Sequence, residues 1–80
     1  MEHILKILPQ YYADINKGIK TFEIRKNDRD YRVGDTLLLC EWNTEQKNFT
    51  GNSIRKEVTY ILRSNSINGL NKNYIIMAIR

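Results

Sequence analysis

The residues best suited to chemistry lie in one short stretch, Lys20 to Asp35, which reads KTFEIRKNDRDYRVGD. Within it Thr21, Glu23 and Arg25 alternate with apolar residues, the pattern of a half-buried strand. Side chains two residues apart share one face of a strand and lie roughly 6.5–7 Å from each other. A hydroxyl, a carboxylate and a planar guanidinium therefore form a row that can donate and accept hydrogen bonds. We expect the recognition surface or active site here.

The same alternation predicts the orientation of this strand. Its apolar residues, Phe22 and Ile24, are expected to point into the core, while the polar row faces the other way. The structural alternative is that Glu23 and Arg25 form only a surface ion pair, which contributes roughly 0–1 kcal/mol. So small a gain does not account for this choice of residues, and we favour a functional role.

The charge balance favours an anionic partner. The 80 residues include 13 Lys and Arg against 9 Asp and Glu, giving a net charge of +4, and basic domains commonly bind nucleic acid. From Lys20 to Arg32, however, five basic residues are interleaved with three acidic ones. Charge alone is therefore equally compatible with a solvated surface of mixed sign.

Length and cysteine content limit the class of protein. Eighty residues predict a single domain over 1–80, close to the smallest size that a core alone stabilises. One Cys and one His form neither a disulfide nor a four-ligand metal site, so we expect no metal and no cofactor. Cys40 falls in an apolar run and is expected to be a core residue. No stretch has the ~20 apolar residues of a membrane span, which predicts a soluble, cytoplasmic protein without membrane contact.

Hydropathy patterns predict five strands and one helix. The strands are expected at 3–8, 20–25, 36–42, 54–62 and 74–79, and the helix begins at Pro9 and ends before Gly18. A hairpin loop at 43–47, a bulge at Gly51, a tight turn at Gly34 and a polar loop at 64–73 connect them. Five strands with one covering helix tend to roll up. We therefore expect an α+β, mainly β fold: a small barrel with the helix between its first two strands and the last strand central.

Several motifs, spread over nearly the whole chain, are similar to one family. HILKILPQYY, GIKTFEIRKNDRDYRVGD, LLLCEWN and VTYIL occur in this order, and KTFEIRKNDRD followed by VGD is the most specific part. Together they resemble the ASCH domains of the PUA-like superfamily, above all its short bacterial and phage branch. The resemblance implies a small β-barrel with a helix between its first two strands. It also implies RNA binding in a cleft beside that helix and the polar strand after it.

Carried onto this sequence, the resemblance implies a set of nucleic-acid-binding residues. The set is Lys6, Lys20, Thr21, Glu23, Arg25, Arg29 and Tyr31. Arg25 can meet a phosphate or the paired acceptors of guanine, and Lys20 a phosphate. Tyr11, Tyr31 or Trp42 can stack on an unpaired base, a contact worth roughly 1–3 kcal/mol. We expect weak, salt-sensitive binding of single-stranded or loop RNA, or of a nucleotide-like ligand.

Catalysis is an alternative. One branch of the superfamily hydrolyses the acyl amide of acetylated cytidine with a lysine, a threonine and a glutamate. Lys20 matches that lysine, but Glu23 stands where the threonine is expected and Thr21 lies elsewhere. The alternative function is therefore an amide hydrolase acting on a modified nucleoside such as N4-acetylcytidine, with Lys20 and Glu23 as catalytic residues. We expect binding rather than catalysis.

A third alternative is a protein-interaction module. An exposed apolar patch on the barrel would be its mark.

Overall fold

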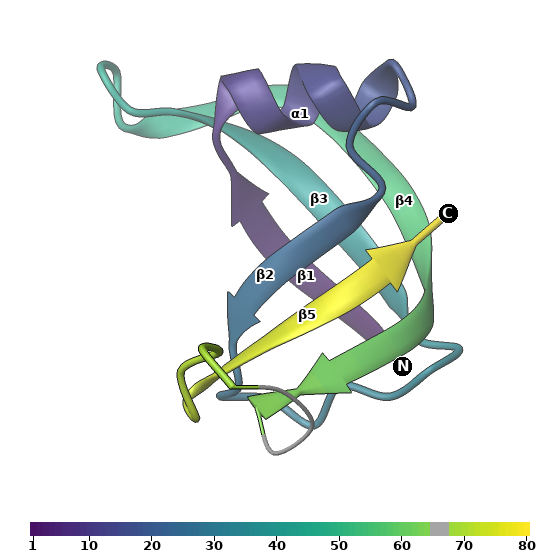
Figure 1. Ribbon diagram of the computed structural model, residues 1–80. Coiled ribbons are helices and arrows are strands. Elements are labelled where there is room, and N and C mark those ends of the chain that lie inside the picture. Colours follow the sequence, from purple (N-terminus) through teal and green to yellow (C-terminus); the bar gives the residue numbers. More distant parts are fainter. Residues whose placement is uncertain (65–67) are drawn as a thin grey trace.

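The computed structural model describes residues 1–64 and 68–80, and in these the chain forms five strands and one helix (Figure 1). In chain order they are β1 (Glu2–Ile7), α1 (Pro9–Asn16), β2 (Phe22–Lys26), β3 (Thr36–Asn43), β4 (Asn48–Arg63) and β5 (Tyr74–Ile79). The predicted order is confirmed, including the helix between the first two strands. Of the polar loop predicted at 64–73, residues 65–67 lie outside the described residues.

The strands form one mixed sheet. Their order is β1-β3-β4-β5-β2, with β1 and β3 parallel and the other neighbours antiparallel. β5 lies between β4 and β2, as predicted for a central strand. The long β4 pairs first with β3 and then with β5, so it curves around one side of the molecule (Figure 1).

The sheet is not closed into a barrel, which corrects the prediction. In the described part of the chain, no backbone ladder joins its two edge strands, β1 and β2. Two arginine side chains cross this β1–β2 seam instead. Arg25 Nη2 donates to the Lys6 carbonyl oxygen (2.7 Å) and Arg29 Nη1 to that of Ile4 (3.2 Å). Because the arginine side chains satisfy these carbonyl groups, the edge of β1 is stable without backbone hydrogen bonds to β2.

The helix follows its predicted signals. Pro9 occupies the first turn, and Gly18 follows the end of α1 with φ of 77°, the left-handed conformation that ends many helices. Ile15 is buried and Tyr12 packs against the core. No helix among residues 1–64 and 68–80 is long and apolar enough to cross a membrane.

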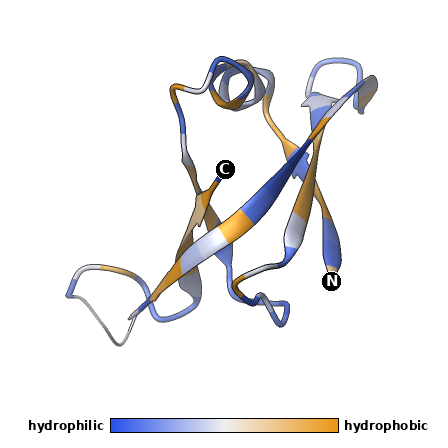
Figure 2. Cartoon of the chain, turned by 90° about the vertical axis from the view of Figure 1, so that its right-hand side faces the viewer, coloured by the Kyte–Doolittle hydropathy of each residue, from blue (hydrophilic) through white to orange (hydrophobic). Residues whose placement is uncertain are grey.

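Alternate residues of the strands build the core. The buried apolar residues are Leu5, Ile7, Ile15, Tyr31, Leu37, Leu39, Val58, Ile75, Met77 and Ile79. Figure 2 shows hydrophobic and hydrophilic residues alternating along β4. In β3, Leu38 and Cys40 are only half-buried. Cys40, predicted to be a core residue, therefore lies on the partly covered face of β3, while Leu37 and Leu39 form its buried face.

β2 faces the opposite way from the prediction. Glu23 and Arg25 lie on the inner face, where Glu23 is opposite the buried Met77 of β5. Phe22 and Ile24 point outward, with 43% and 51% of their surface exposed. Alternation determines which side chains share a face but not which face is inner. The buried carboxylate is tolerated because cations contact it on both sides.

Two irregularities in strand pairing change which side chains of β4 face the core. The register with β3 shifts between Cys40 and Trp42, opposite Gly51, as predicted from that glycine. A second shift lies between Val58 and Tyr60. Val58 is buried whereas Tyr60 is exposed, because the extra residue of a bulge turns the next side chain to the other side.

Candidate ligand-binding cleft

A cleft of about 500 Å³ opens along the β1–β2 seam beside α1. It is lined by Lys6, Ile7, Leu8, Tyr11, Lys20, Phe22, Glu23, Ile24 and Arg25. This volume lies in the range of roughly 300–1,000 Å³ that is usual for sites of small molecules. Four of the residues predicted to bind nucleic acid, Lys6, Lys20, Glu23 and Arg25, are thus brought together.

Glu23 is the centre of an ion-pair cluster in the wall of the cleft. Its Oε1 accepts from Lys20 Nζ (2.6 Å) and its Oε2 from Arg25 Nε (2.9 Å). The carboxylate side chain is 5% exposed, while the two cations are more open to solvent. The cluster therefore holds an ammonium and a guanidinium in fixed positions at the surface of the cleft.

Two aromatic rings flank the ammonium of Lys20. Its Nζ lies 4.8 Å from the Phe22 ring centroid and 5.4 Å from that of Tyr11, within cation–π distance. It also donates to the Phe22 carbonyl oxygen (2.7 Å). Both rings are partly exposed, so each can offer a face to a flat ligand.

A second aromatic pair lies beside the cleft. Lys6 Nζ is 3.8 Å from the Trp42 ring centroid, and Trp42 contacts Phe49 edge to face at 4.8 Å. Lys6 lines the cleft, but Trp42 does not. Trp42, predicted as a stacking residue, thus supports Lys6 from outside the cleft.

The structure separates Thr21 from the predicted polar row. β2 begins at Phe22, and Thr21 before it is exposed and does not line the cleft. Its carbonyl oxygen accepts from the Ile79 amide instead. The row therefore consists of Glu23 and Arg25, with Lys20 completing the cluster.

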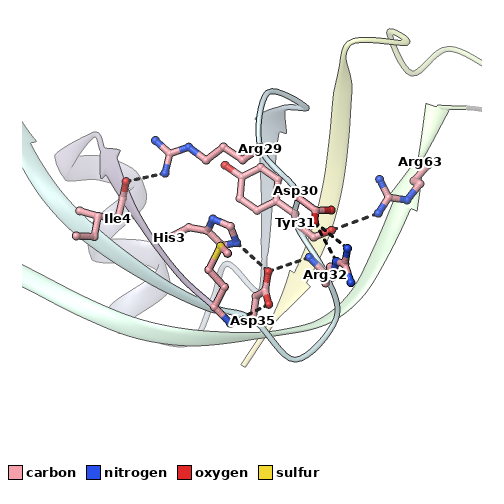
Figure 3. A network of polar contacts seen from close by, with 9 residues as sticks. His3, Ile4, Arg29, Asp30, Tyr31, Arg32, Asp35 and Arg63 are labelled. Carbon is pink, nitrogen blue, oxygen red and sulfur yellow. Dashed lines mark hydrogen bonds and ion pairs between the residues drawn. The ribbon is translucent and has the colours of Figure 1, made fainter.

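Tyr31 and Arg29, both predicted to bind nucleic acid, do not line the cleft. Tyr31 is 2% exposed, and its ring packs 4.6 Å from that of His3, so it cannot stack on a base. Burial raises the pKa of its phenol. Arg29 reaches back from its loop to the Ile4 carbonyl oxygen (Figure 3).

Sequence reasoning missed the buried pair of His3 and Asp35. Asp35 Oδ2 accepts from His3 Nε2 (2.8 Å) and the Arg32 amide (3.0 Å), and its Oδ1 accepts from the Met1 amine (3.2 Å) (Figure 3). The bond from His3, followed by the other two, lowers the pKa of Asp35 to about 2. The alternation of His3, Leu5 and Ile7 in β1 was the available signal, since it places His3 on the inner face. The pair holds the turn before β3 against β1.

Within the residues that the structure describes, no group of three or more His, Cys, Asp or Glu side chains could hold a metal ion.

Exposed apolar side chains of β2, β5 and β4 form an outer apolar face, and two of them, Phe22 and Ile24, also line the cleft. Phe22 is in register with Ala78 of β5, which is in register with Tyr60 of β4. Ile24 and Tyr74 are also exposed on these strands, which lie side by side in Figure 1. Exposed apolar patches of this kind often mark contact surfaces.

Comparison with known proteins identifies a relative and a family of this chain. The chain is 40% identical over 57 residues to the "uncharacterized 12.9 kDa protein in GpA 3'region" of Escherichia phage P2. The aligned part is 71% of this chain and 50% of the relative, so the match spans half the length of that phage protein. A family model described as a domain of unknown function, DUF3850, matches residues 2–79, which include every strand and α1. The chain therefore belongs to the DUF3850 family.

Proposed function

We propose that the cleft along the β1–β2 seam binds a nucleotide, either free or as an unpaired residue of RNA. One observation carries the proposal: the ammonium of Lys20 is held between the exposed rings of Tyr11 and Phe22 at the wall of a cleft of about 500 Å³. A nucleotide combines a flat ring with negative charge, and this wall offers a partner for each.

The aromatic rings supply the contact for the base. A base stacked on Tyr11 or Phe22 gains roughly 1–3 kcal/mol without a requirement for a particular sequence. The apolar side chains of Ile7 and Leu8 complete this part of the wall.

The charged groups favour an anion. Lys6, Lys20 and Arg25 line the cleft against the single carboxylate of Glu23. The guanidinium of Arg25 carries more N–H donors than its contacts to Glu23 and Lys6 use. Glu23 can accept further hydrogen bonds from an exocyclic amine or a ribose hydroxyl.

The resemblance to ASCH domains of the PUA-like superfamily supports the same cleft. In that family RNA is held beside the first helix and the following polar strand. Here α1 contributes Tyr11 to the cleft and β2 contributes Glu23 and Arg25. The net charge of +4 also agrees with an anionic partner.

The test is a titration of fluorescently labelled single-stranded RNA with wild type, Tyr11→Leu and Tyr60→Leu. Both tyrosines are exposed, but Tyr60 does not line the cleft. We expect Tyr11→Leu to weaken binding about tenfold, the loss of one stacking contact, and Tyr60→Leu to bind like wild type. Absence of RNA binding, or equal affinities for all three proteins, contradicts the proposal.

Amide hydrolysis remains a second candidate. It is favoured by the contact of Lys20 with Glu23 inside the cleft, a pair able to move a proton. The exposed position of Thr21 outside the cleft counts against it. Incubation with N4-acetylcytidine, followed by chromatography for free cytidine, decides the matter, because a binding module releases none.

The outer apolar face favours a role in protein interaction. The partner that we propose for it is a second copy of this chain. The exposed parts of its four large side chains add up to roughly 400 Å² of apolar surface, contributed by Phe22, Ile24, Tyr60 and Tyr74. This area is about half of what one partner buries in a stable interface. Sedimentation over a range of concentrations tests this. A dimer that Tyr60→Ser dissociates supports it, and a monomer at every concentration excludes it.

A further inference from the structure

A second, smaller hollow adjoins the cleft along the β1–β2 seam. It measures about 130 Å³ and is lined by Leu5, Arg25, Lys26, Asp28, Arg29 and Tyr31. Arg25 lines both spaces, so they share a wall. Because drug-sized ligands need roughly 300 Å³ or more, the hollow suits a single small group rather than a base with its sugar.

Two guanidinium groups are held in place at this hollow. Arg25 Nη2 donates to the carbonyl oxygen of Lys6. Arg29 Nη1 donates to that of Ile4 (Figure 3). Ile4 and Lys6 are two residues apart on β1, and their carbonyl groups face the same edge, roughly 6.5–7 Å from each other. The strand therefore anchors one nitrogen of each guanidinium to acceptors that are spaced by about that distance.

This spacing is on the scale of a phosphate that bridges two guanidinium groups. A charge-assisted N–H···O contact measures about 2.8 Å, so a phosphate that accepts one from each side spans roughly 8 Å between the two nitrogens. Each planar guanidinium has further donors beside the one that holds β1, and such donors match phosphate oxygens well.

The surroundings add to the positive charge. Lys26 is a third cation in the lining, and Asp28 is the only acid among those six residues. The phenol of Tyr31 also lines the hollow, and Figure 3 shows its oxygen turned toward the side chain of Arg29. A phenol can donate one more hydrogen bond to an anion.

The geometry points to a phosphate site between Arg25 and Arg29, so that a nucleotide whose base occupies the cleft places its phosphate in the adjoining hollow. This inference rests on the proposed function and assigns the place where the phosphate of the nucleotide binds. The phosphate can be a terminal monoester or the diester of an RNA strand, since both present the oxygens that the two arginines contact.

The experiment compares three probes at low salt by calorimetric titration: a nucleoside, its 5′-monophosphate and a dinucleoside monophosphate. For wild type we expect the monophosphate, the dinucleoside monophosphate or both to bind at least tenfold more tightly than the nucleoside. Arg29→Gln is expected to reduce this advantage to about twofold and to leave the affinity for the nucleoside unchanged. The matched control is Arg32→Gln, since Arg32 is an exposed arginine of the same loop that pairs with Asp30.

The outcomes separate this inference from the proposed function. A nucleoside that binds as tightly as both phosphorylated probes overturns the phosphate site but leaves the cleft intact as a binding site. Failure of all three probes to bind overturns both. A preference for the monophosphate alone assigns a terminal phosphate, and equal binding of the two phosphorylated probes assigns a diester as well. The ³¹P resonance of the wild-type complex gives a readout without any substitution, and an unshifted signal at saturation counts against the site.

Discussion

Nη2 of Arg25 lies 2.7 Å from the carbonyl oxygen of Lys6, at the seam where a backbone ladder would close the sheet into a barrel. Nε of the same guanidinium holds the carboxylate of Glu23. A ladder would fill the space between β1 and β2 with backbone, whereas a side chain leaves a cleft beside it. Arg25 therefore links the stability of the fold to the shape of the candidate site.

Replacement of Glu23 by glutamine is expected to destabilise the protein by about 2 kcal/mol, because Lys20 and Arg25 then face each other without the buried carboxylate between them. Urea denaturation measures this. The matched control is Glu57→Gln, which removes an exposed pair with Arg80 and is expected to cost less than about 1 kcal/mol. Equal losses of stability for the two variants would show that burial does not increase the contribution of the ion-pair cluster to the free energy of unfolding.

Replacement of Arg25 by lysine is expected to weaken the seam although the charge is kept. An ammonium lacks the planar fork that reaches Glu23 and the Lys6 carbonyl together, so we expect a loss of about 1 kcal/mol. Hydrogen–deuterium exchange should also become faster in β1 and β2. Arg55→Lys serves as control, since Arg55 makes one exposed contact, to Glu2. Unchanged exchange in β1 and β2 of Arg25→Lys would mean that the seam does not depend on the guanidinium.

We expect the free energy of unfolding to fall at acidic pH because of Asp35. Its pKa falls from an ordinary value of 3.8 to about 2 in the folded protein, chiefly through the bond from His3. A carboxyl whose pKa is depressed by folding stabilises the protein above its unfolded pKa and loses this effect as the pH falls through the folded pKa. The contribution is about 2 kcal/mol, fully present above pH 5 and lost between about pH 4 and pH 2.

Denaturation of wild type and Asp35→Asn across this pH range measures the Asp35 contribution. The difference in the free energy of unfolding between the two proteins should be largest near pH 6 and shrink toward pH 2. Asp30→Asn is the control, because Asp30 makes an exposed pair with Arg32 and its difference should stay small throughout. A wild-type advantage that does not change between pH 6 and pH 2 would contradict the assignment.

The parts of the fold that depend on local chemistry were predictable. Pro9 and Gly18 mark the ends of α1, and Gly51 marks the first irregularity of β4, because each acts through its own backbone. The orientation of β2 was not predictable in this way. Alternation treats Glu23 as a surface residue, and only its contacts with Lys20 and Arg25 make its burial possible.

The candidate site shows the same division. Lys20, Glu23 and Arg25 of the predicted stretch line the cleft, whereas the position of Thr21 outside it and the burial of Tyr31 follow from long-range packing. The bridge from Arg25 to Lys6 joins residues 19 apart in sequence. The closed barrel was expected because edge strands normally need a backbone partner, and nothing local indicates that arginines replace it.

Salt dependence separates the two kinds of contact proposed for the ligand. Each phosphate neutralised on a single strand contributes a slope of about −0.7 to the plot of log K against log salt concentration, whereas a stacked base releases no counterion. We therefore expect Tyr11→Leu to lower RNA affinity at every salt concentration with the slope of wild type. Arg29→Gln should lower the affinity at low salt and make the slope shallower by about 0.7, as expected for the loss of one phosphate contact. Fluorescence titrations between low and physiological salt measure both, with Tyr60→Leu and Arg32→Gln as controls. If the slope changes for Tyr11→Leu and not for Arg29→Gln, the base and the phosphate have been assigned to the wrong ends of the seam.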